Sequence, residues 1–186
     1  MGEVIVIGAG LAGSEAAWQL ANRGLRVIIY EMRPQKLTPA HKTGYFAELV
    51  CSNSLRSKDL TNAVGLLKEE LRKLGSLIIE SADINQIPGG KALVVDRERF
   101  AKYITEKLLN HPNIRFVCEE MTEIPTDKVV IVATGPLTSD PLAKSLAKLI
   151  SEPFLHFYDA ISPIVYGDSI DWGKVFVADR YGEEEG

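Results

Sequence analysis

Three glycines near the start of the chain have the spacing of a phosphate-binding turn. Residues 8–13 read Gly-Ala-Gly-Leu-Ala-Gly and follow the apolar run Val4–Ile7. In such a turn the first glycine permits a tight bend, the second lets a pyrophosphate approach the backbone, and the third lets the following helix pack closely on the sheet. The pattern predicts that a dinucleotide contacts Gly8, Ala9, Gly10, Leu11, Ala12 and Gly13.

A carboxylate follows at the position expected of a ribose-binding acid. Glu31 lies 18 residues past Gly13, at the end of a second apolar run, Val27–Tyr30. A carboxylate at the tip of this strand can accept hydrogen bonds from both hydroxyls of an adenosine ribose, and its charge disfavours a 2′-phosphate. Glycines alone could serve only a turn. Strand, turn, helix, strand and acid in this order predict a site for an ADP-containing dinucleotide.

Cys51 is the candidate nucleophile of the chain. Ser52, Asn53 and Ser54 follow it, and Arg56 and Lys58 lie close in sequence. Nearby cations or a helix N-terminus lower the pKa of a thiol and raise the fraction of thiolate. A single cysteine is more often a small buried hydrophobic residue, so a structural role is the alternative.

The other titratable residues give weaker signals. Cys118 precedes Glu119 and Glu120, whose charges disfavour a thiolate, and we expect it to be inert. His41 is a candidate phosphate contact, but the three histidines lack the spacing of a metal site and no metal is expected. The basic residues near Cys51 form either a solvated face or a guide for an anionic substrate; they are Arg33, Lys36, Lys42, Arg56 and Lys58.

The surrounding chain alternates strand and helix patterns, which predicts an α/β, Rossmann-like fold. Apolar runs predict strands at 4–7, 27–31, 92–95, 114–117 and 129–133. Helical spacing predicts helices at 11–22, 63–74, 97–109 and 141–150. Residues 77–80 fit either an extended segment or a continued helix, and Gly75 favours a break. The run at 129–133 is apolar throughout, which predicts a central strand.

Two features favour FAD over NAD. The strand at 129–133 ends in Ala133, Thr134 and Gly135, small residues that pass close to the cofactor in flavoproteins with two dinucleotide-binding domains. The glycine turn also comes very early, with no substrate domain ahead of it. A plain strand end at Thr134–Gly135 is the alternative interpretation.

Composition limits the class of protein and its cellular location. The chain has 186 residues, a formal net charge of −4 and 46% hydrophobic residues, which is ordinary for a soluble globular protein. Two distant cysteines indicate a reducing compartment, and no run approaches membrane-spanning length, so a cytoplasmic location is expected. Aromatic residues gather beyond Pro153 without helical period. We therefore expect an FAD-binding domain at 1–155 and the start of a second, inserted domain at 156–186.

Five segments together resemble the TrmFO family, the folate- and FAD-dependent tRNA (uracil-5-)-methyltransferases. The motifs Glu-Met-Arg-Pro at 31–34 and Cys-Ser-Asn-Ser-Leu at 51–55 are far more specific than the glycine turn. The similarity runs along the whole chain, and its segments lie at 8–17, 30–34, 38–41, 48–56 and 132–139, with a further stretch at 158–165. Family members continue well past residue 186, so the chain resembles an N-terminal fragment that lacks a second family cysteine and is expected to be inactive alone.

The resemblance implies a reaction and its participants. It implies that methylenetetrahydrofolate supplies a carbon to uridine 54 in the T-loop of tRNA, that FAD relays it and supplies electrons, and that NAD(P)H reduces the flavin. It makes Cys51 the catalytic thiol, which either adds to C6 of the uracil or holds the methylene group on the flavin. The expected cofactor-binding residues are Gly8, Ala9, Gly10, Leu11, Ala12, Gly13, Glu31, Arg33, Ala133, Thr134 and Gly135.

Two rival functions remain at this point. The related MnmG flavoproteins modify the wobble uridine of tRNA, but their fingerprint at the equivalent place is Cys-Asn-Pro followed by glycines, which Cys51–Ser54 does not match. The other rival is a flavin-binding or RNA-docking module without turnover.

Overall fold

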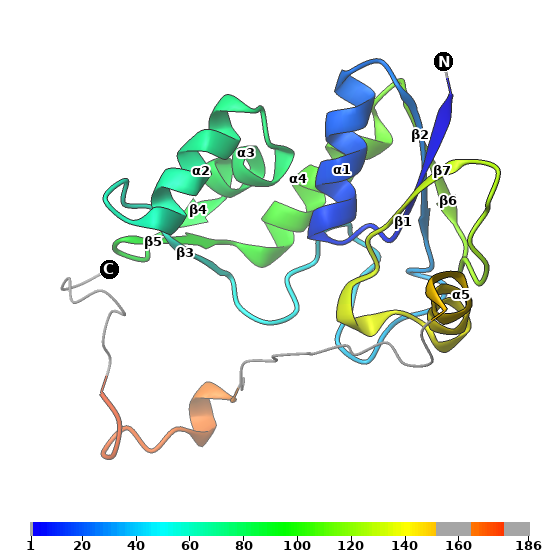
Figure 1. The fold of residues 1–186 in the computed structure, drawn as a ribbon. Coiled ribbons are helices and arrows are strands. Elements are labelled where there is room, and N and C mark those ends of the chain that lie inside the picture. Colours follow the sequence, from blue (N-terminus) through cyan, green and yellow to red (C-terminus); the bar gives the residue numbers. More distant parts are fainter. Residues whose placement is uncertain (1, 152–164, 177–186) are drawn as a thin grey trace.

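Two sheets organise the residues that the computed structural model describes, which are 2–151 and 165–176 (Figure 1). The strands are β1 (Glu3–Ile7), β2 (Arg26–Glu31), β3 (Ser54–Ser57), β4 (Gln86–Ile87), β5 (Ala92–Val95), β6 (Ile114–Cys118) and β7 (Val129–Val132). The helices are α1 (Leu11–Asn22), α2 (Ala63–Lys73), α3 (Leu77–Ile84), α4 (Arg97–Leu109) and α5 (Asp140–Ile150), with short 3₁₀ turns η1 (Gly135–Leu137) and η2 (Gly167–Ser169).

The larger sheet is parallel and has the strand order β6-β2-β1-β7. Val4 pairs with Val27 on one side and with Val129 on the other, so the carboxyl ends of β1, β2 and β7 meet at one edge. In an open parallel sheet, ligands bind outside the carboxyl ends of the strands. The α/β, Rossmann-like fold that the sequence predicts is confirmed.

One prediction for this sheet is wrong. The run at 129–133 is apolar, but in the described part of the chain β7 pairs only with β1 and is an edge strand. Three of its four side chains are half-buried by packing rather than by a second neighbouring strand, since Val130 and Val132 contact the cluster around Ile5, Ile7 and Leu142 of α5. An apolar run therefore indicated burial of the faces, and it did not determine the strand order.

The smaller sheet is antiparallel, with β5 between β3 and β4. It lies beside α2 and α3, away from the parallel sheet, and α4 contacts both α1 and α3 (Figure 1). Because α4 also packs on β6, it connects the two regions. The strand predicted at 92–95 is the centre of this second sheet.

Residues 77–84 form a separate helix, which settles an open alternative in the sequence. Gly75 has a φ of +70° and breaks the helical path after α2. The Ser76 side chain then accepts a hydrogen bond from the backbone N–H of Ile79, which begins α3. Leu77 and Ala82 are fully buried, so packing stabilises this short helix where sequence pattern alone fitted an extended segment.

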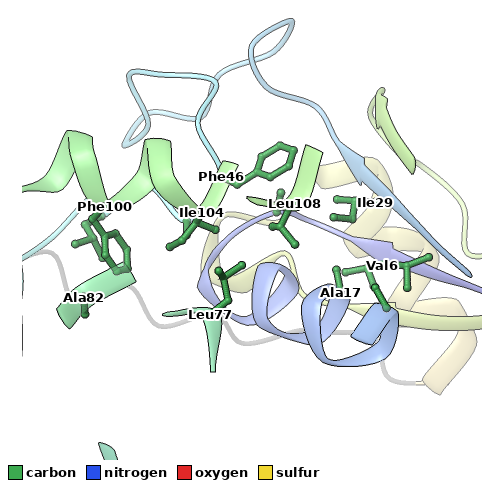
Figure 2. Close-up of a cluster of buried hydrophobic side chains, with 14 of the residues drawn as sticks. Val6, Ala17, Ile29, Phe46, Leu77, Ala82, Phe100, Ile104 and Leu108 are labelled. Carbon is green, nitrogen blue, oxygen red and sulfur yellow. The ribbon is translucent and has the colours of Figure 1, made fainter. Parts of the chain in front are cut away.

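One continuous core joins the two regions. Val6, Ile29 and Ala17 pack between the parallel sheet and α1, while Phe100 and Leu77 belong to the same cluster under α3 and α4 (Figure 2). Each of these five side chains is fully buried.

The boundary predicted at residue 155 lies outside the described residues. So does most of 156–186, of which the structure describes only 165–176. None of the described helices is long and apolar enough to cross a membrane.

Candidate functional site

The glycine turn has the close contacts that its motif requires. Gly8 has a φ of +95°, and a Cβ atom there would lie 2.8 Å from the carbonyl oxygen of Ala133. A Cβ on Gly13 would lie 1.9 Å from the carbonyl oxygen of Gly8, so α1 can approach the end of β1 only with glycine at this place. A Cβ on Gly10 would meet nothing within 4 Å. The first and third glycines therefore serve the protein's own packing, and the second faces open space.

This open space belongs to a cavity of about 510 Å³ at the carboxyl edge of the parallel sheet. Its volume lies within the usual range for ligand pockets, roughly 300–1,000 Å³. Nine of the eleven predicted cofactor-binding residues line it: Gly8, Gly10, Leu11, Ala12, Glu31, Arg33, Ala133, Thr134 and Gly135. The other two, Ala9 and Gly13, lie behind this wall, where Ala9 is fully buried.

Glu31 is held by four N–H groups. Its Oε2 accepts from the backbone N–H of Ala9 at 2.9 Å and from Nη2 of Arg33 at 3.1 Å. Its Oε1 accepts from the backbone N–H and from Nε of Arg33, each at 3.1 Å. A carboxylate has about four lone-pair sites, so a ribose hydroxyl at Glu31 has to share or replace one of these bonds.

The charge on Glu31 is stabilised despite burial. Desolvation raises the pKa of this carboxyl, but the hydrogen bonds and charge of Arg33 and the N–H of Ala9 outweigh it and hold the pKa below its ordinary range. Arg33 is itself only 2% exposed. The pair is therefore a buried ion pair at the wall of the cavity.

Arg33 also holds the long loop that follows β2. Its Nη1 donates to the carbonyl oxygen of Tyr45 at 3.1 Å and to Oε2 of Glu48 at 3.3 Å. Glu48 in turn accepts from the backbone N–H groups of Lys42 and Thr43. The guanidinium of Arg33 thus connects Glu31, at the end of β2, to Tyr45 and Glu48 in the loop that follows.

His41 and Glu48 line the cavity as well, and no role for Glu48 was predicted from the sequence. The ring Nδ1 of His41 lies 2.6 Å from Oγ1 of Thr38. Burial lowers the pKa of His41, and the nearby charge of Arg33 adds to this effect. A neutral ring offers no positive charge, which weakens its case as a phosphate ligand.

The strand end at Thr134–Gly135 forms the wall opposite Glu31. Thr134 and Thr138 share a hydrogen bond of 2.6 Å between their hydroxyl groups, and the Thr138 hydroxyl also donates to the carbonyl oxygen of Gly135 at 2.8 Å. Gly135 has a φ of +63°, a conformation that favours glycine. These contacts shape a narrow turn directly beside Gly8.

Cys51 does not line the cavity, whereas its neighbour Val50 does. The thiol is half-buried, and neither cysteine of the chain forms a disulfide. The Cys51 carbonyl oxygen accepts a hydrogen bond of 2.7 Å from Nη2 of Arg97 at the start of α4. The structure therefore places the candidate nucleophile at the margin of the cavity.

The second cysteine, Cys118, contacts the backbone of the residue that follows β2 by two positions. Its thiol donates to the carbonyl oxygen of Arg33 at 3.3 Å, at the end of β6. Beyond it, Glu119, Glu120 and Met121 line the cavity, which the sequence did not predict because their place depends on the strand order. In the described residues no three His, Cys, Asp or Glu side chains gather as metal ligands.

Comparisons with known proteins place these features in a family. The model of the family described as glucose inhibited division protein A matches residues 3–186. Curated proteins named methylenetetrahydrofolate–tRNA-(uracil-5-)-methyltransferase TrmFO are similar along nearly the whole chain. The one from Aquifex aeolicus is 60% identical over 181 residues, and the one from Desulforamulus reducens is 62% identical over 182.

The matched region makes up nearly all of this chain but less than half of each relative. The matches span 97% and 98% of this chain but only 41% of either relative. Among solved structures, the Aquifex aeolicus GidA structure matches with a TM-score of 0.57 and 20% identity, and covers 72% of this chain and 25% of that one. The structural match supports the fold.

Proposed function

The chain belongs to the glucose inhibited division protein A family, and from this premise we propose that it forms the FAD-binding part of a folate-dependent tRNA (uracil-5-)-methyltransferase. The proposal draws on curated relatives of that name at about 60% identity. Because the chain spans 41% of their length, the reaction is proposed for a protein of the relatives' size.

The residues present fit a dinucleotide such as FAD. The observation that carries the proposal is the open space at Gly10. A Cβ atom there would meet nothing within 4 Å, and Gly10 lines the cavity at the N-terminus of α1. Among the described residues no side chain caps this helix end, so its first N–H groups are available to a pyrophosphate. FAD held by these residues would supply redox chemistry and carry the one-carbon unit of methylenetetrahydrofolate, and NAD(P)H would be the source of electrons.

The other residues of the cavity have distinct roles in this proposal. Residues 8–13 hold the pyrophosphate, and Glu31 accepts a hydrogen bond from a ribose hydroxyl. Arg33 holds the Glu31 carboxylate and the loop that follows it in place. Residues 133–135 approach the cofactor closely because their side chains are small. Residues 1–155 are proposed to be the FAD-binding domain and 156–186 the start of an inserted domain.

Cys51 is proposed to be the catalytic thiol. Carbon 5 of uracil is a poor nucleophile until a nucleophile adds to C6 and leaves an enolate, and a thiolate suits that addition. Val50 lines the cavity, so the next residue can reach a base brought to its margin. The acceptor is proposed to be uridine 54 in the T-loop of tRNA.

The experiment uses a protein of the relatives' length in which these 186 residues replace the matched region. Its visible spectrum should show bound flavin, and it should form 5-methyluridine in tRNA with methylenetetrahydrofolate and NAD(P)H. Cys51→Ala should bind flavin normally and lose methylation. If Cys51→Ala methylates tRNA like the parent, the assignment of the thiol is wrong. Nucleoside analysis that finds a modified wobble uridine instead would favour the MnmG-like function.

A further inference from the structure

The segment that carries Cys51 is fastened to the junction of β5 and α4. Nη2 of Arg97 donates to the carbonyl oxygen of Cys51 at 2.7 Å. Nδ2 of Asn53 donates to the carbonyl oxygen of Val95 at 3.0 Å, and the backbone N–H of Val95 donates to the carbonyl oxygen of Asn53 at the same distance. Three hydrogen bonds thus hold two residues of the segment, Cys51 and Asn53, against Val95 and Arg97.

The junction of β5 and α4 is itself held by burial and by a helix cap. Val95 is fully buried and ends the central strand of the smaller sheet. Asp96 caps α4 through a 3.0 Å hydrogen bond from the backbone N–H of Arg99 to its Oδ1. Within the segment, the Ser52 hydroxyl accepts from the backbone N–H of Ser54 at 3.0 Å. The segment is therefore held both internally and from the adjoining elements.

On the other side of Cys51 along the chain, Val50 lines the cavity. Consecutive Cα atoms are about 3.8 Å apart, so the backbone of Cys51 adjoins the cavity wall. The segment between Val50 and Asn53 is short, and its backbone is held by the hydrogen bonds of Asn53 and Arg97. These two anchors hold the backbone that carries the thiol.

We propose that Asn53 and Arg97 are positioning residues for the Cys51 thiol. The proposal rests on the proposed function, in which Cys51 is the catalytic thiol. Asn53 fixes the backbone just after the nucleophile through both its amide side chain and its carbonyl oxygen. Arg97 fixes the carbonyl group of Cys51 itself and brings a positive charge to the residue that has to ionise.

The first test separates turnover from substrate binding. In the protein of the relatives' length, Arg97→Met and Asn53→Ala should lower kcat for tRNA methylation on the order of 10-fold, because small misplacements of a reacting group are costly. The KM for tRNA and the flavin content should stay unchanged. Arg97→Lys keeps the charge and one donor, so it should recover part of kcat.

Arg99→Met is the matched control. Arg99 is also an exposed arginine in the first turn of α4, but its Nε lies 3.9 Å from Oδ2 of Asp96, so its side chain pairs with the capping carboxylate rather than with Cys51. It should leave kcat and KM unchanged. If Arg97→Met raises KM for tRNA at unchanged kcat, Arg97 binds the nucleic acid and the positioning role is wrong.

The second test does not need the reaction. The rate of Cys51 alkylation by iodoacetamide, followed at the Cys51 peptide by mass spectrometry from pH 6 to pH 9, reports the thiolate in the 186-residue chain. Loss of the Arg97 charge should slow alkylation at pH 7 about threefold, as expected when a cation near a solvated thiol is removed. Arg99→Met and Arg97→Lys should match the parent.

The outcomes distinguish the two proposals. If Cys51 of the unsubstituted protein is alkylated as described but the protein does not methylate tRNA, the proposed function is wrong. The alkylation rates of the variants then decide whether Asn53 and Arg97 position the thiol. Equal alkylation rates and pH profiles in Arg97→Met and the parent, together with unchanged kcat in Arg97→Met and Asn53→Ala, overturn the positioning role.

Discussion

At the scale of single residues, the three glycines of the turn are constrained for different reasons. Gly13 is required by the fold, since a Cβ there would lie 1.9 Å from the carbonyl oxygen of Gly8. Gly10 has nothing within 4 Å of its missing Cβ, so the protein alone does not require glycine there. The demand at Gly10 has to come from a ligand.

This difference predicts opposite results for two substitutions. Gly10→Ala should fold with the parent's thermal stability and lose most of its bound flavin, because the methyl group enters the space proposed for the pyrophosphate. Gly13→Ala should lower the free energy of unfolding by several kcal/mol, since backbone has to move. Gly167→Ala, with nothing within 4 Å of its Cβ, is the control. Normal flavin content in Gly10→Ala would remove the cofactor from this turn.

The Glu31–Arg33 pair predicts a dependence of stability on pH. The folded-state pKa of Glu31 is lowered below its unfolded value of about 4.3, so the pair stabilises the fold above that pH and loses its effect as pH falls through the folded pKa. Glu31→Gln should therefore be less stable than the parent at pH 7, by about 3 kcal/mol, because Arg33 keeps a buried charge. The difference should shrink towards pH 3. Urea unfolding at pH 7, 5 and 3 measures it, and a constant difference would contradict the assignment.

Sequence spacing predicted the acid at residue 31 but not the residues that surround it. Glu31 follows from the strand, the turn and the distance to Gly13, which are local features. The contacts of Arg33 with Tyr45 and Glu48 depend on the path of a loop without periodicity, and no local pattern encodes that path.

At the scale of elements, helices with caps were the most predictable part. The helix predicted at 97–109 matches α4, whose N-cap Asp96 accepts a hydrogen bond on its Oδ1 from the backbone N–H of Arg99. α3 was ambiguous because eight residues are too few to show a helical period, although Ser76 and Glu80 lie where a capping serine and a first-turn acid belong. The edge position of β7 was mispredicted because partial packing against the cluster of Leu142 in α5 favours the same apolar run as a place between two strands.

Ser76 connects α3 to α1, and its removal should show this. Its hydroxyl accepts from the N–H of Ile79 and donates to Oε2 of Glu15 at 2.9 Å. Ser76→Ala should lower the free energy of unfolding by about 1–2 kcal/mol, since the helix loses its cap and Glu15 a partner. Ser76→Thr keeps the hydroxyl and should lose less. Chemical denaturation measures both, and equal losses would show that the hydroxyl is not responsible.

At the scale of the whole molecule, a shared core joins the two sheets. Phe100 on α4 and Val6 on β1 are fully buried in the same cluster (Figure 2). The larger sheet carries the cavity, and the junction of β5 and α4 holds the segment of Cys51. A common core therefore fixes the distance between the proposed cofactor site and the candidate nucleophile.

This arrangement predicts that the two regions unfold together. Phe100→Ala should lower the free energy of unfolding by about 3–5 kcal/mol, as expected for a buried aromatic side chain. With Trp172 replaced by Phe, the fluorescence of Trp18 reports on α1 while circular dichroism reports on all helices. The two signals should give the same denaturation midpoint in the parent and in Phe100→Ala. Separate midpoints would show that the regions are independent.

The edge position of β7 has a consequence for how the isolated chain behaves at high concentration. β7 is an apolar strand whose first residue, Val129, is 64% exposed, and in the described residues its outer backbone groups have no neighbouring strand. Such an edge is a template on which another chain can add a strand, and natural proteins protect it with charge or a cover. Solutions of these 186 residues should thus become turbid with rising concentration, and a lysine introduced at Val129 should delay that turbidity.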